Sequence, residues 1–231
     1  MNKNIVREIK RTFSAKQDEI RLRLGDFKHV WDKDDDEIFT ELVFCLLTPQ
    51  SKARTCWNVV VNLREKGLLW NGDINHIVNE LVGVRFKNKK ASYIVEARKL
   101  FSNNGKIAIK SKLKLFNDTY KLRDWLVHNV KGLGFKEASH FLRNIGLGEN
   151  MAILDRHILK NLNLLGVIVD VQSSLSKKKY FEIEDKMMNF ASKVNIPMNY
   201  LDLLLWYKET GDIFILNRGI ICDFWGRFTF V

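Results

Sequence analysis

The sequence predicts an all-α fold, and three observations support this prediction. Apolar residues recur at helical spacing along most of the 231-residue chain. Only two prolines occur, Pro49 and Pro197, which favours long helices over a many-turned β-sandwich. A strand-like pattern appears only weakly, at 167–171 and in the tail after Gly211. Because no repeat or low-complexity linker divides the chain, we expect residues 1–231 to form one helical unit of two lobes with a cleft between them.

The helices can be assigned in order from their spacing and end signals. An amphipathic, charged helix is expected from Asn4 to about Leu24, and the acidic residues that start at Asp32 should open a nearly all-apolar helix. That helix should end at Thr48, because the residue before a proline disfavours helical geometry. Pro197 fits the first turn of the last helix, where a missing N–H costs nothing. The remaining helices are expected at 51–65, 88–101, before Asn129, around 138–145, at 156–165, 176–194 and 197–210.

Charge and cysteine content narrow the function classes. The formal net charge is +11 and the sequence pI is about 9.5, so the protein either binds a polyanion such as nucleic acid or carries a basic surface that serves solubility. The three cysteines are widely scattered and form no C-x-x-C pair. This excludes a zinc ribbon and a four-cysteine iron–sulfur cluster. The cysteines are Cys45, Cys56 and Cys222.

The chain shows no signal for export or membrane insertion. Its charged N-terminus lacks a secretory apolar core, and no run of about 18 apolar residues suggests a membrane span. We therefore expect an intracellular protein of the cytoplasm or nucleoid with no membrane partner. Nothing in the sequence indicates an oligomer, so a monomer is expected.

A glycine-containing hairpin, VKGLGF at 130–135, lies between two of the expected helices. Gly132 and Gly134 allow positive φ and let a phosphate approach the backbone closely. The helix after the hairpin presents N–H groups at its start, which attract an anion. This pattern is typical of a helix–hairpin–helix that grips DNA without reading its sequence, although an ordinary turn between packed helices has the same glycines.

The stretch KGLGFKEASHFLRNIGLGENMAILDRHILKNL, residues 131–162, resembles the signature of the helix–hairpin–helix, Gly/Pro…Asp superfamily of DNA glycosylases. Within it, the chain is most similar to archaeal-type 8-oxoguanine DNA glycosylases, the second class of that activity. Similar stretches are LLTPQSKA, GVRFKNKKASYIVEAR and LDLLLWYKETG, so the resemblance extends to about Gly211. It implies a base excision repair enzyme, a bifunctional glycosylase and abasic-site (AP) lyase that acts on damaged double-stranded DNA and requires no cofactor.

The resemblance assigns the catalytic groups to Lys136 and Asp155. In bifunctional members a lysine opens the second hairpin helix two residues after the last glycine, and the essential aspartate lies 155 − 136 = 19 residues downstream. The lysine amine must attack C1′ as the base leaves, forming a Schiff base that allows β-elimination. The carboxylate stabilises the developing positive sugar. Taken alone, a lysine at a helix start usually points into water, and an aspartate in this context is often an N-cap.

The resemblance also implies supporting residues. Gln50 matches a residue that inserts into the vacated base stack, and His157 matches one that contacts the DNA backbone. Phe86 and Trp206 resemble aromatic walls of the base pocket. The hairpin carbonyls of this class often hold a monovalent cation; here they are those of His128, Val130 and Leu133. Arg85 and Lys87, with Lys89 and Lys90, suit the DNA phosphates. Four of these assignments have a plainer alternative: an exposed turn residue at 50, a surface histidine at 157, a core tryptophan at 206, and a solvated helix start for the basic cluster.

The C-terminal tail departs from the class. Chains of this class characteristically end a few residues after the segment W-Y-x-x-T-G, and their terminal lysine and carboxylate help recognise the oxidised base. Here Ile215 stands where the last residue is expected, and residues 212–231 form an atypical tail. Three explanations stay open: the tail displaces the groups that recognise the base, the tail folds away and other groups take over that recognition, or the tail is an artefact.

Two rival functions remain at the level of sequence. An endonuclease-III-like glycosylase for oxidised pyrimidines usually carries a four-cysteine cluster, which this chain lacks. A non-enzymatic helix–hairpin–helix binding module needs the phosphate grip but neither Lys136 nor Asp155. A purely helical scaffold leaves the basic charge and the hairpin unexplained.

Overall fold

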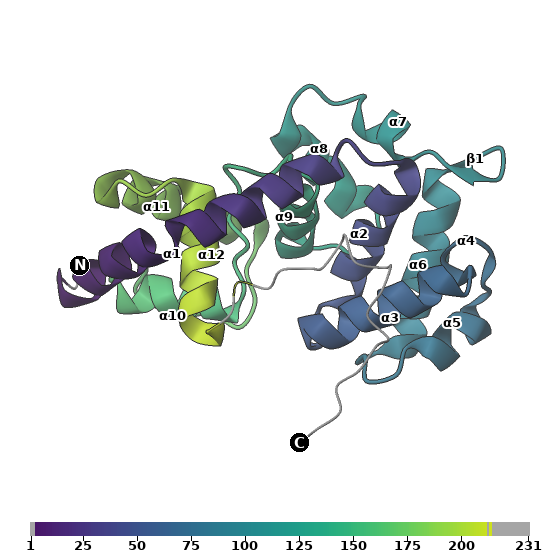
Figure 1. The fold of residues 1–231 in the computed structure, drawn as a ribbon, viewed down its shortest axis with the longest axis horizontal. Helices are drawn as coiled ribbons and strands as arrows, with labels where there is room; N and C mark the ends of the chain where they lie inside the picture. Colours follow the sequence, from purple (N-terminus) through teal and green to yellow (C-terminus); the bar gives the residue numbers. More distant parts are fainter. Residues whose placement is uncertain (1–2, 212, 214–231) are drawn as a thin grey trace, which may run out of the picture.

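The prediction of an all-α fold is confirmed. The computed structural model describes residues 3–211 and 213, and helices dominate them, with one two-stranded antiparallel hairpin (Figure 1). The helices are α1 (Lys3–Val30), α2 (Asp35–Leu47), α3 (Ala53–Glu65), α4 (Leu68–Asn71), α5 (Ile74–Glu80), α6 (Lys87–Phe101), α7 (Ile109–Leu113), α8 (Thr119–Asn129), α9 (Phe135–Asn144), α10 (Arg156–Leu164), α11 (Lys177–Val194) and α12 (Met198–Thr210). The strands are β1 (Ser102–Asn103) and β2 (Lys106–Ile107).

The ends of α2 follow the sequence signals. Asp34 is the N-cap, and its carboxylate accepts the amide of Glu37 at 2.9 Å, which satisfies one of the free donors at the helix start. Acidic residues fill the first turn, as expected for a helix N-terminus. Thr48 is the C-cap before Pro49, so the predicted stop is confirmed. Nearly all of α2 is buried, because the helix carries apolar residues on every face.

Several details of the helix prediction were wrong. Helix α1 continues beyond Leu24 to Val30, and Pro197 is the N-cap of α12 rather than a first-turn residue. Residues 167–171 form no strand but a loop, in which Ile168 is buried and Val169 is 94% exposed. The short elements α4, α5, α7, β1 and β2 were not foreseen, because two to seven residues are too few to show a period. The predicted strand pattern and base recognition after Gly211 lie outside the described residues, except for the buried Ile213.

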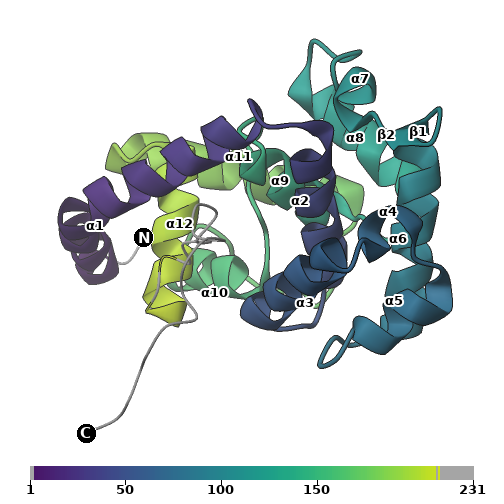
Figure 2. The ribbon, with the colours of Figure 1, turned by 45° about the vertical axis from the view of Figure 1, so that its right-hand side comes forward.

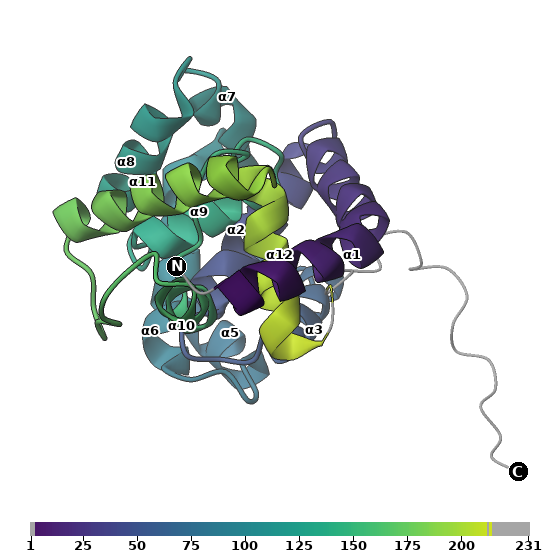
Figure 3. The same cartoon turned by 90° about the vertical axis from the view of Figure 1, so that its left-hand side faces the viewer.

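The buried apolar residues form two clusters. The first cluster is built by α2 to α9, and the second by α1, α10, α11 and α12. Figures 1 and 2 show the two groups of helices side by side, and in Figure 3 the second group faces the viewer, with α1 crossing α12. Helix α9 places Ala138 and Phe141 in the first cluster, whereas Phe135 at its start packs against the second. The hairpin before α9 therefore lies where the two clusters meet.

Hydropathy and side-chain clustering add two observations. No helix in the described part of the chain has the length and apolar character needed to cross a membrane. Among the same residues, no group of three or more His, Cys, Asp or Glu side chains could hold a metal ion.

Candidate active site

The hairpin turns between α8 and α9 with one glycine in a left-handed conformation. The amide of Leu133 donates to the carbonyl of Val130 at 3.1 Å, which closes the turn. Gly132 has φ +93°, and a Cβ there would clash with the ring carbons of Tyr93. Both facts require glycine at 132. Gly134 has φ −92°, so the expectation of positive φ is confirmed for Gly132 and wrong for Gly134.

Lys136 lies in the first turn of α9 and is held by its neighbour. Its Nζ is 2.9 Å from Oε1 of Glu137, and the two side chains are 26% and 13% exposed. The other oxygen of Glu137 accepts the amide of Gly134 at 3.1 Å. The same carboxylate thus caps the helix and orients the lysine. Sequence reasoning missed Glu137, although a glutamate three residues after an N-cap is a known capping signal.

Two titratable side chains near Lys136, His140 and Cys45, are shifted toward their neutral forms; Cys45 is fully buried and His140 is half-buried. Burial lowers the pKa of His140 well below its usual range, and the charges of Arg143, Lys136 and Arg23 lower it further. Burial also raises the pKa of the Cys45 thiol well above its usual value. His140 packs edge-on against Phe44, with ring centroids 5.7 Å apart. His140 and Cys45 therefore add no negative charge beside Lys136, whose ion-pair partner is Glu137.

Asp155 is the N-cap of α10. Its Oδ1 accepts the amides of His157 and Ile158, both at 2.8 Å, and the residue is half-buried. The capping role considered from sequence is therefore real. It does not exclude catalysis, because both amides bind Oδ1 and neither hydrogen bond uses Oδ2.

Two buried carboxylates fix the segment that leads to Asp155. The amide of Ala152 donates to Glu184 of α11 at 2.8 Å, and the amide of Ile153 donates to Asp202 of α12 at 3.1 Å. Tyr180 adds a third contact, since its hydroxyl donates to the carbonyl of Ala152 at 2.5 Å. Residues 151–154 are buried throughout. The backbone just before Asp155 is therefore held by side chains from two helices.

Each carboxylate also binds an arginine from a hairpin helix. Arg123 of α8 is fully buried and bidentate to Glu184, with distances of 2.7 and 2.8 Å. Arg123 further donates to Ser139 of α9 at 3.0 Å. Arg143 of α9 donates to Asp202 at 2.7 Å. We call these the Glu184 bridge and the Asp202 bridge; they tie the Asp155 segment to the helices that carry the hairpin and Lys136.

Sequence reasoning missed both bridges. For Asp202 the available signal was a lone charge in the apolar run LDLLLW; Arg123 gave no such signal, because Lys121 and Asp124 lie close to it in the sequence. A charge in such a position is buried only if it is paired, so each one predicts a partner elsewhere in the fold.

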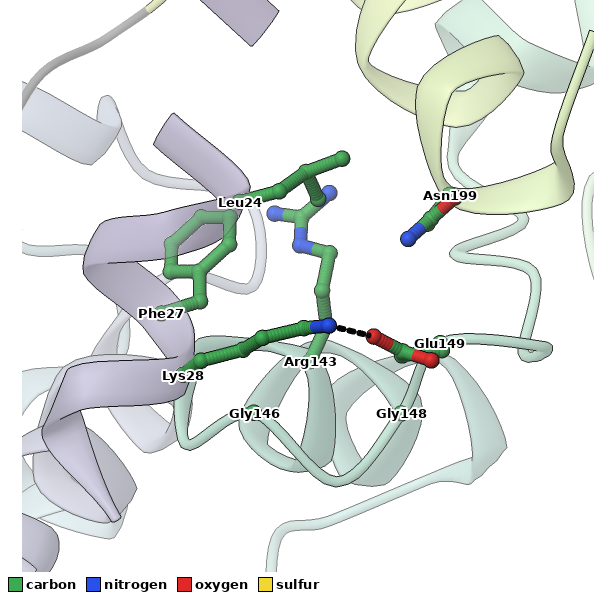
Figure 4. A pocket seen from close by; sticks show the side chains of 8 residues that line it. All are labelled: Leu24, Phe27, Lys28, Arg143, Gly146, Gly148, Glu149 and Asn199. Carbon is green, nitrogen blue, oxygen red and sulfur yellow. Dashed lines mark ion pairs between the residues drawn. The ribbon is translucent and has the colours of Figure 1, made fainter. Parts of the chain in front are cut away.

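A small cavity lies beside the Asp202 bridge (Figure 4). It is lined by Leu24 and Phe27 of α1 and by Arg143, and the ion pair between Lys28 and Glu149, 2.6 Å long, lies across it. Its volume of about 10 Å³ admits about one water molecule. Because neither Lys136 nor Asp155 lines it, this cavity is not the base pocket.

The Asp202 bridge makes the stability depend on pH. Burial raises the pKa of Asp202 to about 6, because desolvation of the carboxylate outweighs the help of Arg143 and the Ile153 amide. The folded state thus holds this proton between about pH 4 and 6 while the unfolded state releases it, so the contribution of Asp202 to stability should fall by about 3 kcal/mol across that window and stay level above it. Urea unfolding at several pH values gives the free energy of unfolding of the wild type and of Asp202→Asn, and the difference between the two should change with pH by this amount. A difference that is constant with pH would contradict it.

Four sequence-predicted DNA contacts lie on two neighbouring loops. Gln50 is exposed in the turn between α2 and α3 with φ 55°. Phe86 is the N-cap of α6 with φ 59°, and its ring is 53% exposed. Arg85 and Lys87 flank it and are exposed, with the Arg85 guanidinium 5.6 Å from the Phe86 ring centroid. Lys90 does not belong with them: it is 4% exposed and donates to backbone carbonyls, so its assignment to the phosphate-binding cluster was wrong.

The remaining candidates lie on α8, α10 and α12 and in the hairpin. His157 is half-buried, with Nδ1 3.8 Å from Glu209 of α12. Trp206 is half-buried against the second cluster, which is compatible with either a core or a pocket role. In the hairpin, Val130 and Leu133 are buried and His128 is exposed at the end of α8. The Val130 carbonyl, one of the three candidate cation ligands, already accepts the Leu133 amide.

Comparison with known proteins identifies the family. The model of the family described as 8-oxoguanine DNA glycosylase, with its helix–hairpin–helix, matches residues 20–196. This chain belongs to the 8-oxoguanine DNA glycosylase family. A relative from Fusobacterium nucleatum named 8-oxoguanine DNA glycosylase/AP lyase is 46% identical over 90% of this chain and 96% of its own length. Another of that name, from Methanocaldococcus jannaschii, is 38% identical over 85% and 92%.

Solved structures of this glycosylase family share the fold. The crystal structure of a Methanocaldococcus jannaschii 8-oxoguanine glycosylase/lyase in complex with a 15mer DNA containing 8-oxoguanine has a TM-score of 0.83 and is 33% identical. The match covers 91% of this chain and 99% of that one. The glycosylase of Thermotoga maritima matches with a TM-score of 0.80 at 30% identity, over 91% and 98%. The recognition of the family from the hairpin and its flanking stretches is therefore confirmed.

Proposed function

We propose that this protein is a bifunctional DNA glycosylase and AP lyase that removes 8-oxoguanine from duplex DNA. The observation that carries the proposal is the placement of Lys136. It lies in the first turn of α9, oriented by Glu137, while two buried bridges hold the Asp155 segment against the helices of the same hairpin. The membership of the 8-oxoguanine DNA glycosylase family supports the substrate.

The proposed chemistry uses Lys136 as nucleophile. Its deprotonated Nζ attacks C1′ of the extruded nucleotide, the bond from C1′ to the base breaks, and the base leaves with the electron pair and takes up a proton. Asp155 stabilises the positive charge that develops on the sugar. The attached nitrogen gives up its remaining proton as needed, the sugar ring opens at the C1′–O4′ bond, and O4′ takes up a proton, which leaves a Schiff base between Nζ and C1′. The Schiff base acidifies the 2′ hydrogen, and loss of that proton expels the 3′ phosphate by β-elimination. The strand is thereby cut 3′ to the lesion.

The other candidate residues act on the duplex. The hairpin backbone at Gly132 and Gly134 binds phosphate, with a monovalent cation at its carbonyls, and Arg85, Lys87 and His157 contact the backbone of the strand. Gln50 fills the vacated stack, and Phe86 and Trp206 form aromatic walls for the base. We propose that the protein acts inside the cell as a monomer on damaged DNA and needs no cofactor for these steps.

Trapping with borohydride tests the proposal. Borohydride reduces the Schiff base to a stable amine, so the wild-type protein should form a covalent adduct with a duplex that contains 8-oxoguanine, measured as a shifted band on a denaturing gel. A duplex with an oxidised pyrimidine and an undamaged duplex are the comparisons. An adduct only with the oxidised pyrimidine would indicate the rival glycosylase, and binding without any adduct would indicate a binding module.

A further inference from the structure

Lys90 of α6 is a buried cation that holds a turn of the first cluster. Its Nζ donates to the carbonyls of Leu47 and Pro49, each at 2.7 Å, and to Oγ of Ser51 at 3.2 Å. All three donors of the ammonium group are thus used inside the protein. The group lies at the C-terminal end of α2, where helix carbonyls carry partial negative charge. Lys90 therefore fixes the turn at 47–51 rather than facing solvent.

Ser51 joins this turn to the loop before α6. Its Oγ also accepts the amide of Arg85 at 3.0 Å. Each joined loop carries one non-glycine residue with positive φ, Gln50 at 55° and Phe86 at 59°. Such conformations cost about 1–3 kcal/mol each and persist where surrounding contacts enforce them, commonly at ligand-binding positions. The Lys90–Ser51 brace thus holds two exposed side chains on one rigid platform.

The brace lies close to Lys136. Helix α2 packs on both α6 and α9, which carry Lys90 and Lys136. Burial lowers the pKa of Lys90, and the positive charges of Lys136 and Arg85 lower it further while Cys56 and Glu137 raise it. Lys136 is therefore within electrostatic reach of the buried ammonium. Gln50 and Phe86 lie on the turn and the loop that this brace joins.

We propose that Lys90 and Ser51 are positioning residues whose brace presents Gln50 and Phe86 together to the duplex and promotes extrusion of the damaged nucleotide. This inference rests on the proposed function. Extrusion leaves a gap in the stack and exposes a base face, and a rigid amide and a rigid aromatic ring suit these two surfaces. Without the brace both loops relax, and extrusion slows while bond breaking at Lys136 does not.

Two duplexes separate extrusion from chemistry. One contains 8-oxoguanine, and the other contains a preformed abasic site, which has no base to unstack. Under single-turnover conditions Lys90→Met should slow borohydride trapping on the 8-oxoguanine duplex by about tenfold to a hundredfold, the scale of a misplaced catalytic geometry. Trapping on the abasic duplex should change by less than about threefold. A 2-aminopurine beside the lesion should show a smaller fluorescence rise than with the wild type, because fewer bases are extruded.

Matched variants decide the outcome. Lys99→Met removes an exposed lysine from the same helix and should change none of the three readouts. Ser51→Ala keeps the carbonyl contacts of Lys90 and removes the link to Arg85, so it should slow trapping only on the 8-oxoguanine duplex, by about threefold to tenfold. This variant tests the brace if Lys90→Met does not fold. Equal slowing on both duplexes, or none on either, would overturn the inference. Failure of the wild type on both duplexes would overturn the proposed function and the inference with it.

Discussion

Lys136→Gln should abolish the borohydride-trapped adduct and lower strand cleavage by more than about a thousandfold, the scale expected when a covalent nucleophile is lost. Glutamine has no amine to form a Schiff base, yet its amide can still hydrogen-bond to Glu137 where the lysine pairs with it. The cap from Glu137 to Gly134 does not involve Lys136, so the start of α9 should persist. Denaturing gels measure the adduct, and gel shift measures binding to the same duplex.

Lys131→Gln is the matched control. Lys131 lies in the same hairpin, is 63% exposed and pairs with Glu96, so the change removes the same charge without removing the nucleophile. The control should keep the trapped adduct, and both variants should bind DNA slightly more weakly at low salt, since each loses one positive charge. If Lys136→Gln still formed the adduct, the nucleophile would be a lysine other than Lys136.

Asp155→Asn should lower single-turnover excision by about a hundredfold to a thousandfold, the usual cost of removing a charge that stabilises a transition state. Asparagine caps helices about as well as aspartate, so the two hydrogen bonds to the start of α10 should remain and the stability should change little. The variant therefore separates the charge of Asp155 from its capping role. Quench-flow excision assays and urea unfolding measure the two effects.

Asp155→Ala removes both functions and serves as the comparison. It should lose about 1 kcal/mol of stability in addition to the same catalytic defect, because alanine cannot cap. If Asp155→Asn excised as fast as the wild type while Asp155→Ala was slow, the aspartate would act through the cap alone. Abasic-site trapping should be less sensitive to Asp155→Asn than excision is, since the base has already left.

The sequence predicted the helices that have two or more turns, and it located the hairpin, because these features depend on local periodicity and on glycines. Lys136 and Asp155 were assigned by a motif, and the structure places them at two helix starts that side-chain contacts connect. Their catalytic roles stay predictions, as do the DNA and cation contacts. Phe86 and Gln50 were assigned by resemblance alone, and their strained backbone could not be read from sequence.

Contacts between distant segments could not be predicted. Lys90 lies in the run KNKK, which looks like a solvated helix start. In the structure its ammonium group is buried because it donates to the carbonyl of Leu47, 43 residues away, and the sequence does not indicate this contact. The positive φ expected at Gly134 was wrong because Glu137 caps an extended residue there. In each case the deciding contact was a hydrogen bond whose partner the local pattern does not specify.

The Glu184 and Asp202 bridges also couple catalysis to the cooperativity of unfolding. Glu184 and Asp202 come from helices of the second cluster, whereas Arg123 and Arg143 come from helices that line the first. Neither cluster can open without breaking a bridge and exposing a charge that was buried and paired. The amides of Ala152 and Ile153 should therefore exchange with solvent deuterium only through global unfolding. We therefore expect no partly unfolded state that keeps Lys136 in place while it releases the loop of Asp155.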